Sequence, residues 1–173
     1  MRKGFIYIDP EKCLACRTCE LECAVAHSVS KNLAGSIAEV PSPAYRINVQ
    51  CAGDTASPFN CRHCEDAPCI AVCPAGAVKR ENPESPVLVE EEKCIGCKYC
   101  IIVCPFGVIN LDKSGRAVLK CDLCVERLKE GMVPACAAAC PTKALKFRDI
   151  GSESAGDREK SIEKIRKVPG NRR

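Results

Sequence analysis

The sequence predicts a small α+β fold in which one structural unit recurs along the chain. Three observations predict it. Sixteen of the 17 cysteines in this 173-residue chain fall into four sets of four. Three of these sets end in Cys-Pro, and a proline disfavours continuation of a helix through the residue before it. Short apolar segments precede and follow the sets at matching positions. This internal repetition predicts a unit of short strand, cysteine-rich loop, short helix and second strand.

The four cysteine sets have the spacing of metal ligands. In chain order they are set one to set four: Cys13, Cys16, Cys19 and Cys23; Cys61, Cys64, Cys69 and Cys73; Cys94, Cys97, Cys100 and Cys104; and Cys121, Cys124, Cys136 and Cys140. Set three reads C-x2-C-x2-C-x3-C-P, a spacing in which three cysteines bind one [4Fe–4S] cluster and the fourth binds its neighbour. The sequence therefore predicts four [4Fe–4S] clusters with all sixteen cysteines as ligands. Clusters in a row indicate an electron conduit.

Zinc binding and a disulfide scaffold are the alternatives for so many cysteines. Paired C-x2-C motifs are typical of structural zinc sites. Zinc, however, requires neither the crowding of three cysteines into one short loop nor a proline after the fourth. A disulfide scaffold is expected in a secreted chain, yet the first residues lead directly into the apolar segment Phe5–Ile8 without a signal-peptide pattern. The pattern therefore favours iron–sulfur clusters.

The composition leaves little apolar material for a core. The chain has no Trp, four Phe and three Tyr, and its hydrophobic fraction of 46% includes the cysteines. We therefore predict that the chain does not fold without iron, because metal-binding free energy is then folding free energy. The formal charge of +4 counts the cysteines as neutral. Four clusters with their thiolates would add about −8, so the basic excess is interpreted as compensation for cluster charge, and no nucleic-acid partner is expected.

Short strands are predicted around the sets. Ile6–Cys13 and Val87–Cys94 match each other, and each is an apolar strand followed by Glu-Lys-Cys. Further strands are expected after each Cys-Pro and before set four: Ala77–Lys79, Val108–Asn110, Ala144–Lys146 and Val118–Lys120. Between two of them, Asp112–Gly115 predicts a hairpin turn.

Three short helices have signals of their own. Leu123–Glu130 predicts a helix that ends at Gly131. Pro68 and Pro134 each fit the first position of a helix, where a missing N–H is tolerated.

Four lysines adjoin cysteines of the sets, where they could raise cluster potentials or simply be solvated: Lys12, Lys93, Lys98 and Lys120.

Set one departs from the pattern, because Cys23 is followed by Ala24 and an insertion up to residue 60. Within the insertion, Tyr45–Cys51 alternates apolar and polar residues, which predicts a half-buried strand. Cys51 falls on the apolar side, so we expect a buried free thiol in preference to a ligand or redox role. His63 lies inside set two and is expected to donate a hydrogen bond or to pack, since its set already has four cysteines.

These motifs resemble those of four-cluster ferredoxin-like subunits that carry electrons for molybdopterin oxidoreductases, hydrogenases and carbon monoxide dehydrogenase. The run C-R-H-C-E-D-A-P-C-I-A-V-C-P from Cys61 is similar to the hallmark of that family, and the resemblance covers Phe5 to about Phe147. Within the family, Cys13–Ser28 most resembles the small iron–sulfur protein associated with carbon monoxide dehydrogenase. Ala24 and the insertion depart from the pattern.

The resemblance implies two nested bacterial-ferredoxin-like modules. An outer dicluster module would comprise residues 1–27 and 121–150, an inner one residues 61–120, and the strand-containing insertion residues 28–60. It also implies that each fourth cysteine binds the cluster of another set. The implied ligand groups are Cys61, Cys64, Cys69 with Cys104; Cys94, Cys97, Cys100 with Cys73; Cys13, Cys16, Cys19 with Cys140; and Cys121, Cys124, Cys136 with Cys23.

The resemblance further implies a non-catalytic electron-transfer subunit. The expected donor is an anaerobic carbon monoxide dehydrogenase. A molybdopterin oxidoreductase such as a formate dehydrogenase, or a hydrogenase, is the alternative, and a second redox protein would be the acceptor. Catalysis by the chain itself would need an open coordination site or a substrate pocket, and the motifs offer neither. A scaffold or assembly role would be compatible with the same clusters.

The remaining segments carry weaker signals. Residues 151–173 form a polar tail, for which disorder is favoured over a short amphipathic docking helix near Arg158–Lys167. The apolar run Ile101–Ile109 is interrupted by Pro105 and is too short to span a membrane. With no twin-arginine signal at the N-terminus, a cytoplasmic location is expected.

Overall fold

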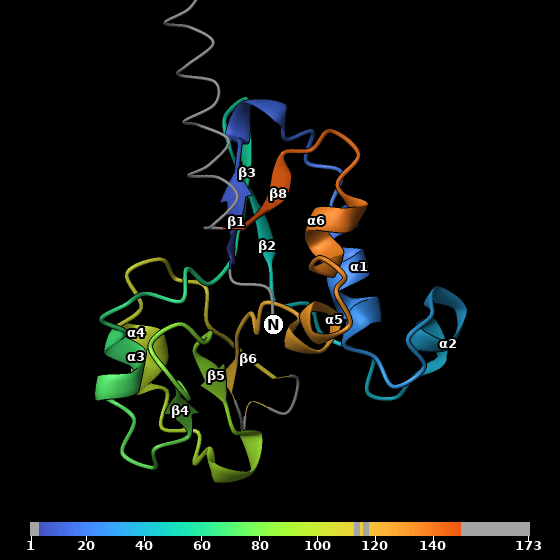
Figure 1. The fold of residues 1–173 in the computed structure, drawn as a ribbon. Helices are drawn as coiled ribbons and strands as arrows, with labels where there is room; N and C mark the ends of the chain where they lie inside the picture. Colours follow the sequence, from blue (N-terminus) through green and yellow to red (C-terminus); the bar gives the residue numbers. More distant parts are fainter. Residues whose placement is uncertain (1–3, 113–114, 116–117, 150–173) are drawn as a thin grey trace, which may run out of the picture.

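The computed structural model describes residues 4–112, 115 and 118–149. Its elements are short and follow one another in the order shown in Figure 1. They are β1 (Gly4–Ile8), η1 (Pro10–Lys12), α1 (Thr18–Ala26), α2 (Leu33–Ala38), β2 (Asn48–Ala52), β3 (Thr55–Phe59), α3 (Pro68–Ala71), β4 (Val78–Lys79), β5 (Leu88–Val89), η2 (Glu91–Lys93), α4 (Tyr99–Ile102), β6 (Asn110–Leu111), β7 (Val118–Leu119), α5 (Val125–Lys129), α6 (Ala135–Ala139) and β8 (Leu145–Asp149). The predicted tail lies outside the described residues.

The two ends of the described chain lie together in one half of the molecule. Strands β1 and β8 pair antiparallel, with Ile6 opposite Phe147, and the N–H of Asp9 extends the pairing to the carbonyl of Ala144 at 2.8 Å. Helix α1 packs against α6 beside this sheet, and the β2–β3 hairpin overlaps the sheet in the view of Figure 1. Set one and set four therefore belong to the same half of the fold.

The other half contains the middle of the sequence. It has two small antiparallel sheets, β4–β5 and β6–β7, and helices α3 and α4, which contact each other. Sets two and three are both in this half. The described chain is thus built from short helices and small antiparallel hairpins, as in a ferredoxin-like 4Fe–4S domain.

Each half has a hydrophobic core that mixes aliphatic side chains with cysteines. The first core surrounds α1 and the β1–β8 sheet: Ile6, Ile47, Val49, Leu128 and Leu145 with Cys19, Cys23, Cys136 and Cys140. The second lies under α3 and α4: Val78, Val87, Ile109 and Val118 with Cys69 and Cys100. Sulfur atoms therefore occupy central positions in both cores.

Most of the predicted strands and turns are confirmed within one or two residues. The hairpin turn is closed by a hydrogen bond from the N–H of Gly115 to the carbonyl of Asp112 at 3.0 Å. Pro68 is the first residue of α3, whereas Pro134 is the N-cap of α6, one position earlier than predicted. The predicted helix from Leu123 starts late, because Leu123 and Cys124 both have positive φ and α5 begins only after them.

The residue after the fourth cysteine decides where the preceding helix stops. After Cys73, Cys104 and Cys140, proline ends the helical path and a tight turn follows. In each turn the N–H three residues on donates to the cysteine carbonyl, and that residue has φ near +60°: Gly76, Gly107 and Lys143. Cys23 is followed by Ala24, which keeps its N–H, so α1 continues to Ala26 and is nine residues long.

The prediction of a buried Cys51 is wrong. Ile47 and Val49 of the predicted alternation are buried, but Cys51 is exposed. The reason is the partner strand β3, which no pattern predicted: it makes a hairpin whose turn, at Gly53 and Asp54, projects beyond the core. Strand β3 contains Pro58 opposite Val49, a position that a two-stranded sheet tolerates because it has only edges.

Helix α2 was also missed, although its start has a recognisable signal. The Asn32 side chain caps it by accepting from the N–H of Gly35 at 2.8 Å. After the helix, the Glu39 carboxylate accepts hydrogen bonds from the N–H groups of Val29 and Ser30, so the end of α2 lies close to the loop that precedes it. Among the described residues, no helix has the length and apolar character needed to cross a membrane.

Candidate metal centres

Two groups of four thiols surround cavities in the half that contains α3 and α4. One cavity is lined by the first three cysteines of set two and the last of set three: Cys61, Cys64, Cys69 and Cys104. The other is lined by the first three cysteines of set three and the last of set two: Cys73, Cys94, Cys97 and Cys100. Helices α3 and α4 exchange these fourth cysteines, because each helix ends at the cavity of the other loop. We call these groups the set-two site and the set-three site.

The remaining eight cysteines gather in the other half. Burial raises the pKa of Cys136. The nearby thiols of Cys121, Cys23 and Cys124 raise it further. Cys13, Cys19 and Cys140 lie in one core cluster, which also contains Cys23 and Cys136. Burial raises the pKa of Cys19 most, followed by Glu20, and the nearby thiol of Cys16 adds to this effect. Following the pairing that the resemblance implies, we use the name set-four site for Cys121, Cys124, Cys136 with Cys23 and the name set-one site for Cys13, Cys16, Cys19 with Cys140.

The first two cysteines of every set are joined by the same backbone geometry. The residue immediately before the second cysteine has positive φ in all four loops: Ala15, His63, Gly96 and Leu123. Three of these four are not glycine, so the loops hold a conformation that L-residues usually avoid. This turn directs backbone N–H groups at sulfur, as His63 N to Cys61 Sγ and Leu123 N to Cys121 Sγ, both at 3.4 Å.

Two further N–H···S contacts reach fourth cysteines, one from a remote segment and one from the strand that follows the cysteine. Arg46 N, in the insertion, donates to Cys23 Sγ at 3.2 Å, and Leu145 N donates to Cys140 Sγ at 3.4 Å. Donors to sulfur stabilise a thiolate and raise the potential of a cluster bound to it. The insertion thus supports Cys23, which has no proline after it.

The buried thiols fit a polynuclear metal centre better than a set of free cysteines. None of the 17 cysteines forms a disulfide. Burial raises the pKa of Cys19 and of Cys124 to about 11, and it raises the pKa of Cys69, Cys100, Cys121 and Cys136 as well. Bare thiolates are therefore disfavoured here, whereas bound iron would supply the positive charge that deprotonates them.

Polar groups around the set-two site also fit a cluster. His63 lines the cavity, and its Nδ1 accepts a hydrogen bond from Val87 N at 3.1 Å, which leaves the proton of the neutral ring on Nε2. That Nε2 is buried and has no partner in the described structure. Burial, with Lys120 nearby, lowers the pKa of His63 to about 3. The hydrogen bond that the structure shows is therefore accepted by His63, where the sequence predicted that it donates one, and Nε2 would be available to donate to the sulfur of a cluster bound at this site.

The four sites differ in their access to solvent. Cys16 of the set-one site and Cys97 of the set-three site are exposed, and so are the neighbouring apolar residues Leu14 (71%) and Ile95 (68%). All four cysteines of the set-four site are buried. The exposed cysteines of the set-one and set-three sites suit exchange of electrons with other proteins, since redox partners must come close.

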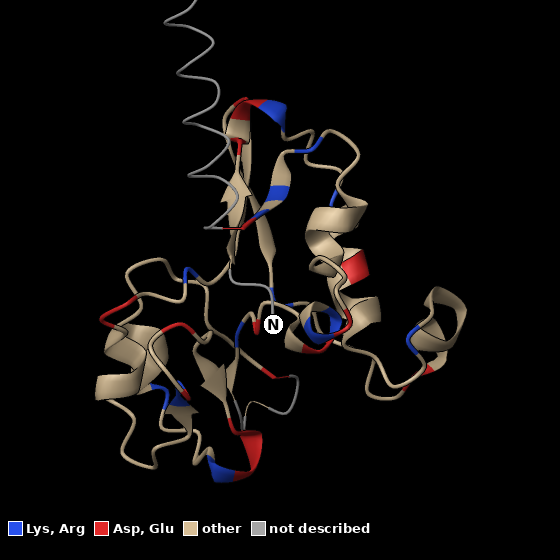
Figure 2. Cartoon of the chain, viewed as in Figure 1, with Lys and Arg blue, Asp and Glu red and all other residues tan. Residues whose placement is uncertain are grey.

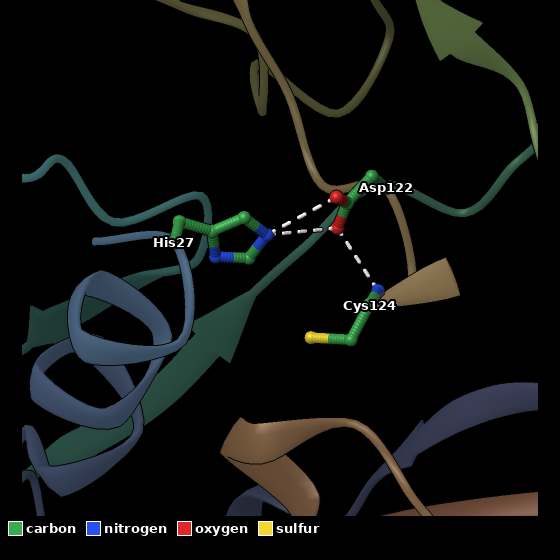
Figure 3. Close-up of side chains that lie close together, drawn as sticks. All are labelled: His27, Asp122 and Cys124. Atoms are coloured by element: carbon green, nitrogen blue, oxygen red, sulfur yellow. Dashed lines mark hydrogen bonds and ion pairs between the residues drawn. The ribbon is translucent and has the colours of Figure 1, made fainter. Parts of the chain in front are cut away.

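A partly buried polar network holds the set-four loop to α1 and the insertion, and Figure 3 shows the contacts of Asp122 with His27 and Cys124. Asp122, between Cys121 and Cys124, accepts from His27 Nε2 at 3.0 Å, from Arg46 Nη1 at 2.8 Å and from the N–H of Cys124 at 2.9 Å. Burial by itself would raise the pKa of Asp122 and lower that of His27. The hydrogen bond from His27 and the charges of His27 and Arg46 together outweigh burial at Asp122 and lower its pKa. At His27, the hydrogen bonds and charges of Asp122 and Cys23 together outweigh burial and raise the pKa to about 10.

Charged side chains are otherwise dispersed over both halves of the described chain (Figure 2). Lys12, Lys93 and Lys98 are exposed, in agreement with the solvated alternative, whereas Lys120 is buried. Asp122, Arg46 and the burial of Lys120 were not found by reading the sequence. His27 and Asp122 are 95 residues apart and have no common spacing, so no local signal could have paired them.

Comparisons with known proteins agree with this geometry. Residues 55–150, which include sets two to four, match the 4Fe-4S dicluster domain family. An iron-sulfur protein of Rhodospirillum rubrum is 41% identical over 94% of this chain and 90% of its own length. The electron transport protein HydN of Escherichia coli K12 is 40% identical over 82% of this chain and 85% of its own. The thiosulfate reductase electron transfer subunit PhsB of Salmonella typhi is 36% identical over 80% of this chain and 72% of its own.

These similarities contradict the zinc and disulfide alternatives for sets two to four. They also extend beyond the matched domain, because the Rhodospirillum rubrum protein aligns with nearly the whole chain, set one included. The names of the relatives describe electron transport. The chain belongs to the 4Fe-4S dicluster domain family of electron-transfer iron–sulfur proteins.

Proposed function

We propose that the chain is a non-catalytic electron-transfer subunit that relays single electrons through four [4Fe–4S] clusters. The observation that carries the proposal is the pair of cavities lined by four thiols each, in which sets two and three exchange their fourth cysteines, and it is supported by the gathering of the other eight cysteines in the second half. The clusters would supply reversible one-electron chemistry. The sixteen cysteines would be their ligands in the set-one, set-two, set-three and set-four sites.

We further propose that the four sites form two nested modules. Residues 61–120 would be the inner module, residues 1–27 with 121–150 the outer one, and residues 28–60 an insertion. The pairing of β1 with β8, and the packing of α1 on α6 and of α3 on α4, support this division. The sites would follow one another in the order set-one, set-four, set-two, set-three. Two pKa shifts support this order. The pKa of Cys136 is raised mainly by burial and by Cys121, Cys23 and Cys124, and Cys19 raises it further. The pKa of Cys100 is raised first by burial and then by Cys69.

The protein residues have three tasks in this proposal. The cysteine loops fix the positions of the ligands, backbone N–H groups and His63 donate to sulfur, and the apolar cores exclude water from the set-four and set-two sites. None of these tasks needs a substrate pocket with acid–base groups. The electron-transfer names of HydN and PhsB are consistent with a role as carrier for a catalytic partner.

The proposed donor is a carbon monoxide dehydrogenase, and a second redox protein is the acceptor. The resemblance of Cys13–Ser28 to the iron–sulfur protein of that system supports this choice. A molybdopterin oxidoreductase or a hydrogenase is the second candidate, favoured by the similarity to a thiosulfate reductase subunit.

Anaerobic affinity purification of the full chain from its own cells, followed by mass spectrometry, tests the choice of partner. We expect a nickel–iron–sulfur carbon monoxide dehydrogenase to co-purify and to reduce the isolated chain when carbon monoxide is added. Co-purification of a molybdopterin subunit in its place would contradict this donor and favour the second candidate. The same purification from cells that lack the donor gene is the control.

A further inference from the structure

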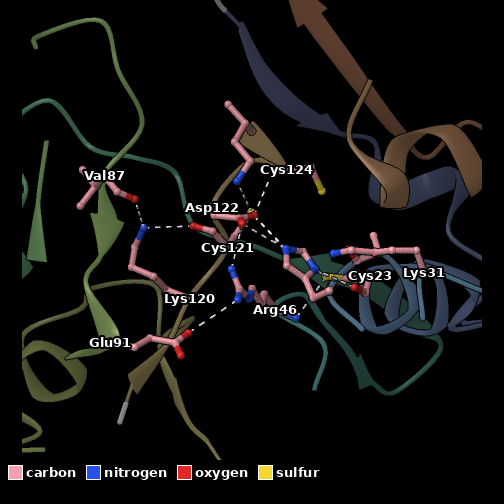
Figure 4. A network of polar contacts seen from close by, with 12 residues as sticks. Cys23, Lys31, Arg46, Val87, Glu91, Lys120, Cys121, Asp122 and Cys124 are labelled. Atoms are coloured by element: carbon pink, nitrogen blue, oxygen red, sulfur yellow. Dashed lines mark hydrogen bonds and ion pairs between the residues drawn. The ribbon is translucent and has the colours of Figure 1, made fainter. Parts of the chain in front are cut away.

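A buried hydrogen-bonded chain connects the loops of set two and set four, and Figure 4 shows its part from Val87 through Lys120 to Cys121. The side chain of Lys120 is only 4% exposed, and its Nζ donates to the carbonyl of Val87 and, at 3.0 Å, to that of Cys121. The N–H of Val87 in turn donates to His63 Nδ1 at 3.1 Å. The connection therefore runs from the loop between Cys61 and Cys64, through Val87 and Lys120, to the first cysteine of set four.

The residue directly before the first cysteine of a set is exposed in sets one and three and buried in sets two and four. Lys12 and Lys93, before sets one and three, are exposed and pair with carboxylates three residues earlier, Asp9 and Glu90. Lys120 is buried and bonds the carbonyl of the following cysteine. Asn60, before set two, is also buried and donates to the carbonyl of Cys61 at 3.0 Å. Inward-facing donors thus occur at the two sites nearest the junction between the halves.

The ammonium of Lys120 has no carboxylate partner among the described residues, and its two acceptors are backbone carbonyls. Such a buried charge is costly unless negative charge lies nearby. The thiolates of the set-two and set-four sites can provide it. Val87, whose carbonyl accepts from Lys120 Nζ, lines the cavity of the set-two site. Cys121, which follows Lys120 in the chain, belongs to the set-four site.

We propose that Lys120 is a positioning residue for electron transfer between the two halves. It holds the set-two and set-four loops together through Val87, and its charge raises the reduction potentials of the clusters bound at these two sites and not at the other two. This inference rests on the proposed function, because it requires clusters at both sites. Higher potentials at the set-two and set-four sites would allow the central clusters to accept electrons from either the set-one or the set-three site.

The test is a potentiometric titration of the reconstituted full chain, followed by electron paramagnetic resonance. Lys120→Met keeps the length of the side chain and removes its charge. We expect the equilibrium constant for reduction to fall about tenfold at two clusters, a shift of about 59 mV for a one-electron couple, with the other two unchanged. Lys93→Met is the matched control, since Lys93 also precedes a first cysteine but is exposed, and it should shift no potential by a comparable amount.

Iron and sulfide content separate the possible failures. If wild-type protein lacks four clusters, the proposed function fails. If it holds four and Lys120→Met shifts none of them, shifts all four alike, or matches Lys93→Met, the inference about Lys120 is overturned and the proposed function stands. Should Lys120→Met lose clusters, Lys120→Gln retains a donor for the two carbonyls and must show the same paired shift.

Discussion

Removal of iron is expected to unfold the chain completely. The secondary structure of the described residues is too small to persist alone: each of the four sheets has two strands, and the longest helix, α1, has nine residues. Isolated hairpins and helices of this length are marginal in water. The hydrophobic cores are completed by cysteine sulfur, so loss of the clusters would leave buried thiols and cavities where ligands had been. The lost stabilisation would exceed the roughly 5–15 kcal/mol by which most domains are stable.

Far-ultraviolet circular dichroism of chain treated with a chelator and a thiol reductant measures this effect. The reductant keeps the cysteines from forming disulfides, which could otherwise hold the apo-chain compact. Reconstitution with iron and sulfide should restore the native spectrum and serves as the control. A native-like spectrum with cooperative thermal unfolding after complete iron removal would refute the view that clusters complete the core.

Asp122→Asn is expected to destabilise the half that contains sets one and four by about 3 kcal/mol. Asn keeps the shape of the side chain but removes the negative charge that His27 and Arg46 share. Both partners would remain largely buried without their counter-ion, and this penalty exceeds the loss of an ordinary hydrogen bond. The set-four loop would also lose its attachment to the insertion, whose Arg46 N donates to Cys23 Sγ.

Anaerobic guanidinium denaturation of the reconstituted protein, followed by cluster absorbance, measures this loss. The unfolding midpoint should fall, and the set-four site should be the first to lose iron. Asp54→Asn is the matched control, because it makes the same change in the exposed turn of the β2–β3 hairpin and should leave the midpoint unchanged. Equal midpoints for Asp122→Asn and wild type would contradict the role assigned to the network.

Local features were predictable from the sequence where a single residue type decides the geometry. Proline after a fourth cysteine ends a helix, and the sequence Asp112–Gly115 makes a turn, so these elements were found near their true positions. The start of α5 was misplaced because ligand geometry overrides helix propensity: Leu123 and Cys124 adopt positive φ so that the loop can direct N–H groups at sulfur.

Contacts between distant segments could not be predicted in the same way. The exposure of Cys51 depends on how far the β2–β3 hairpin extends beyond the core, and its alternating pattern contains no information on that length. Lys120 has the same sequence context as Lys93, a lysine directly before a first cysteine. Only the fold distinguishes them, because Lys120 meets Val87 at the junction of the halves while Lys93 faces solvent. The sequence was therefore sufficient to predict the cysteine ligands, but it was not sufficient to predict the polar residues around them.

The most direct test of the relay is the number of electrons that one chain accepts. Anaerobic reductive titration of fully reconstituted protein with a low-potential reductant, followed by absorbance and electron paramagnetic resonance, gives this number. The proposed four-cluster relay predicts four one-electron equivalents per chain and magnetic interaction between neighbouring reduced clusters. An uptake of two electrons or fewer in protein with a full complement of iron would contradict a four-cluster relay.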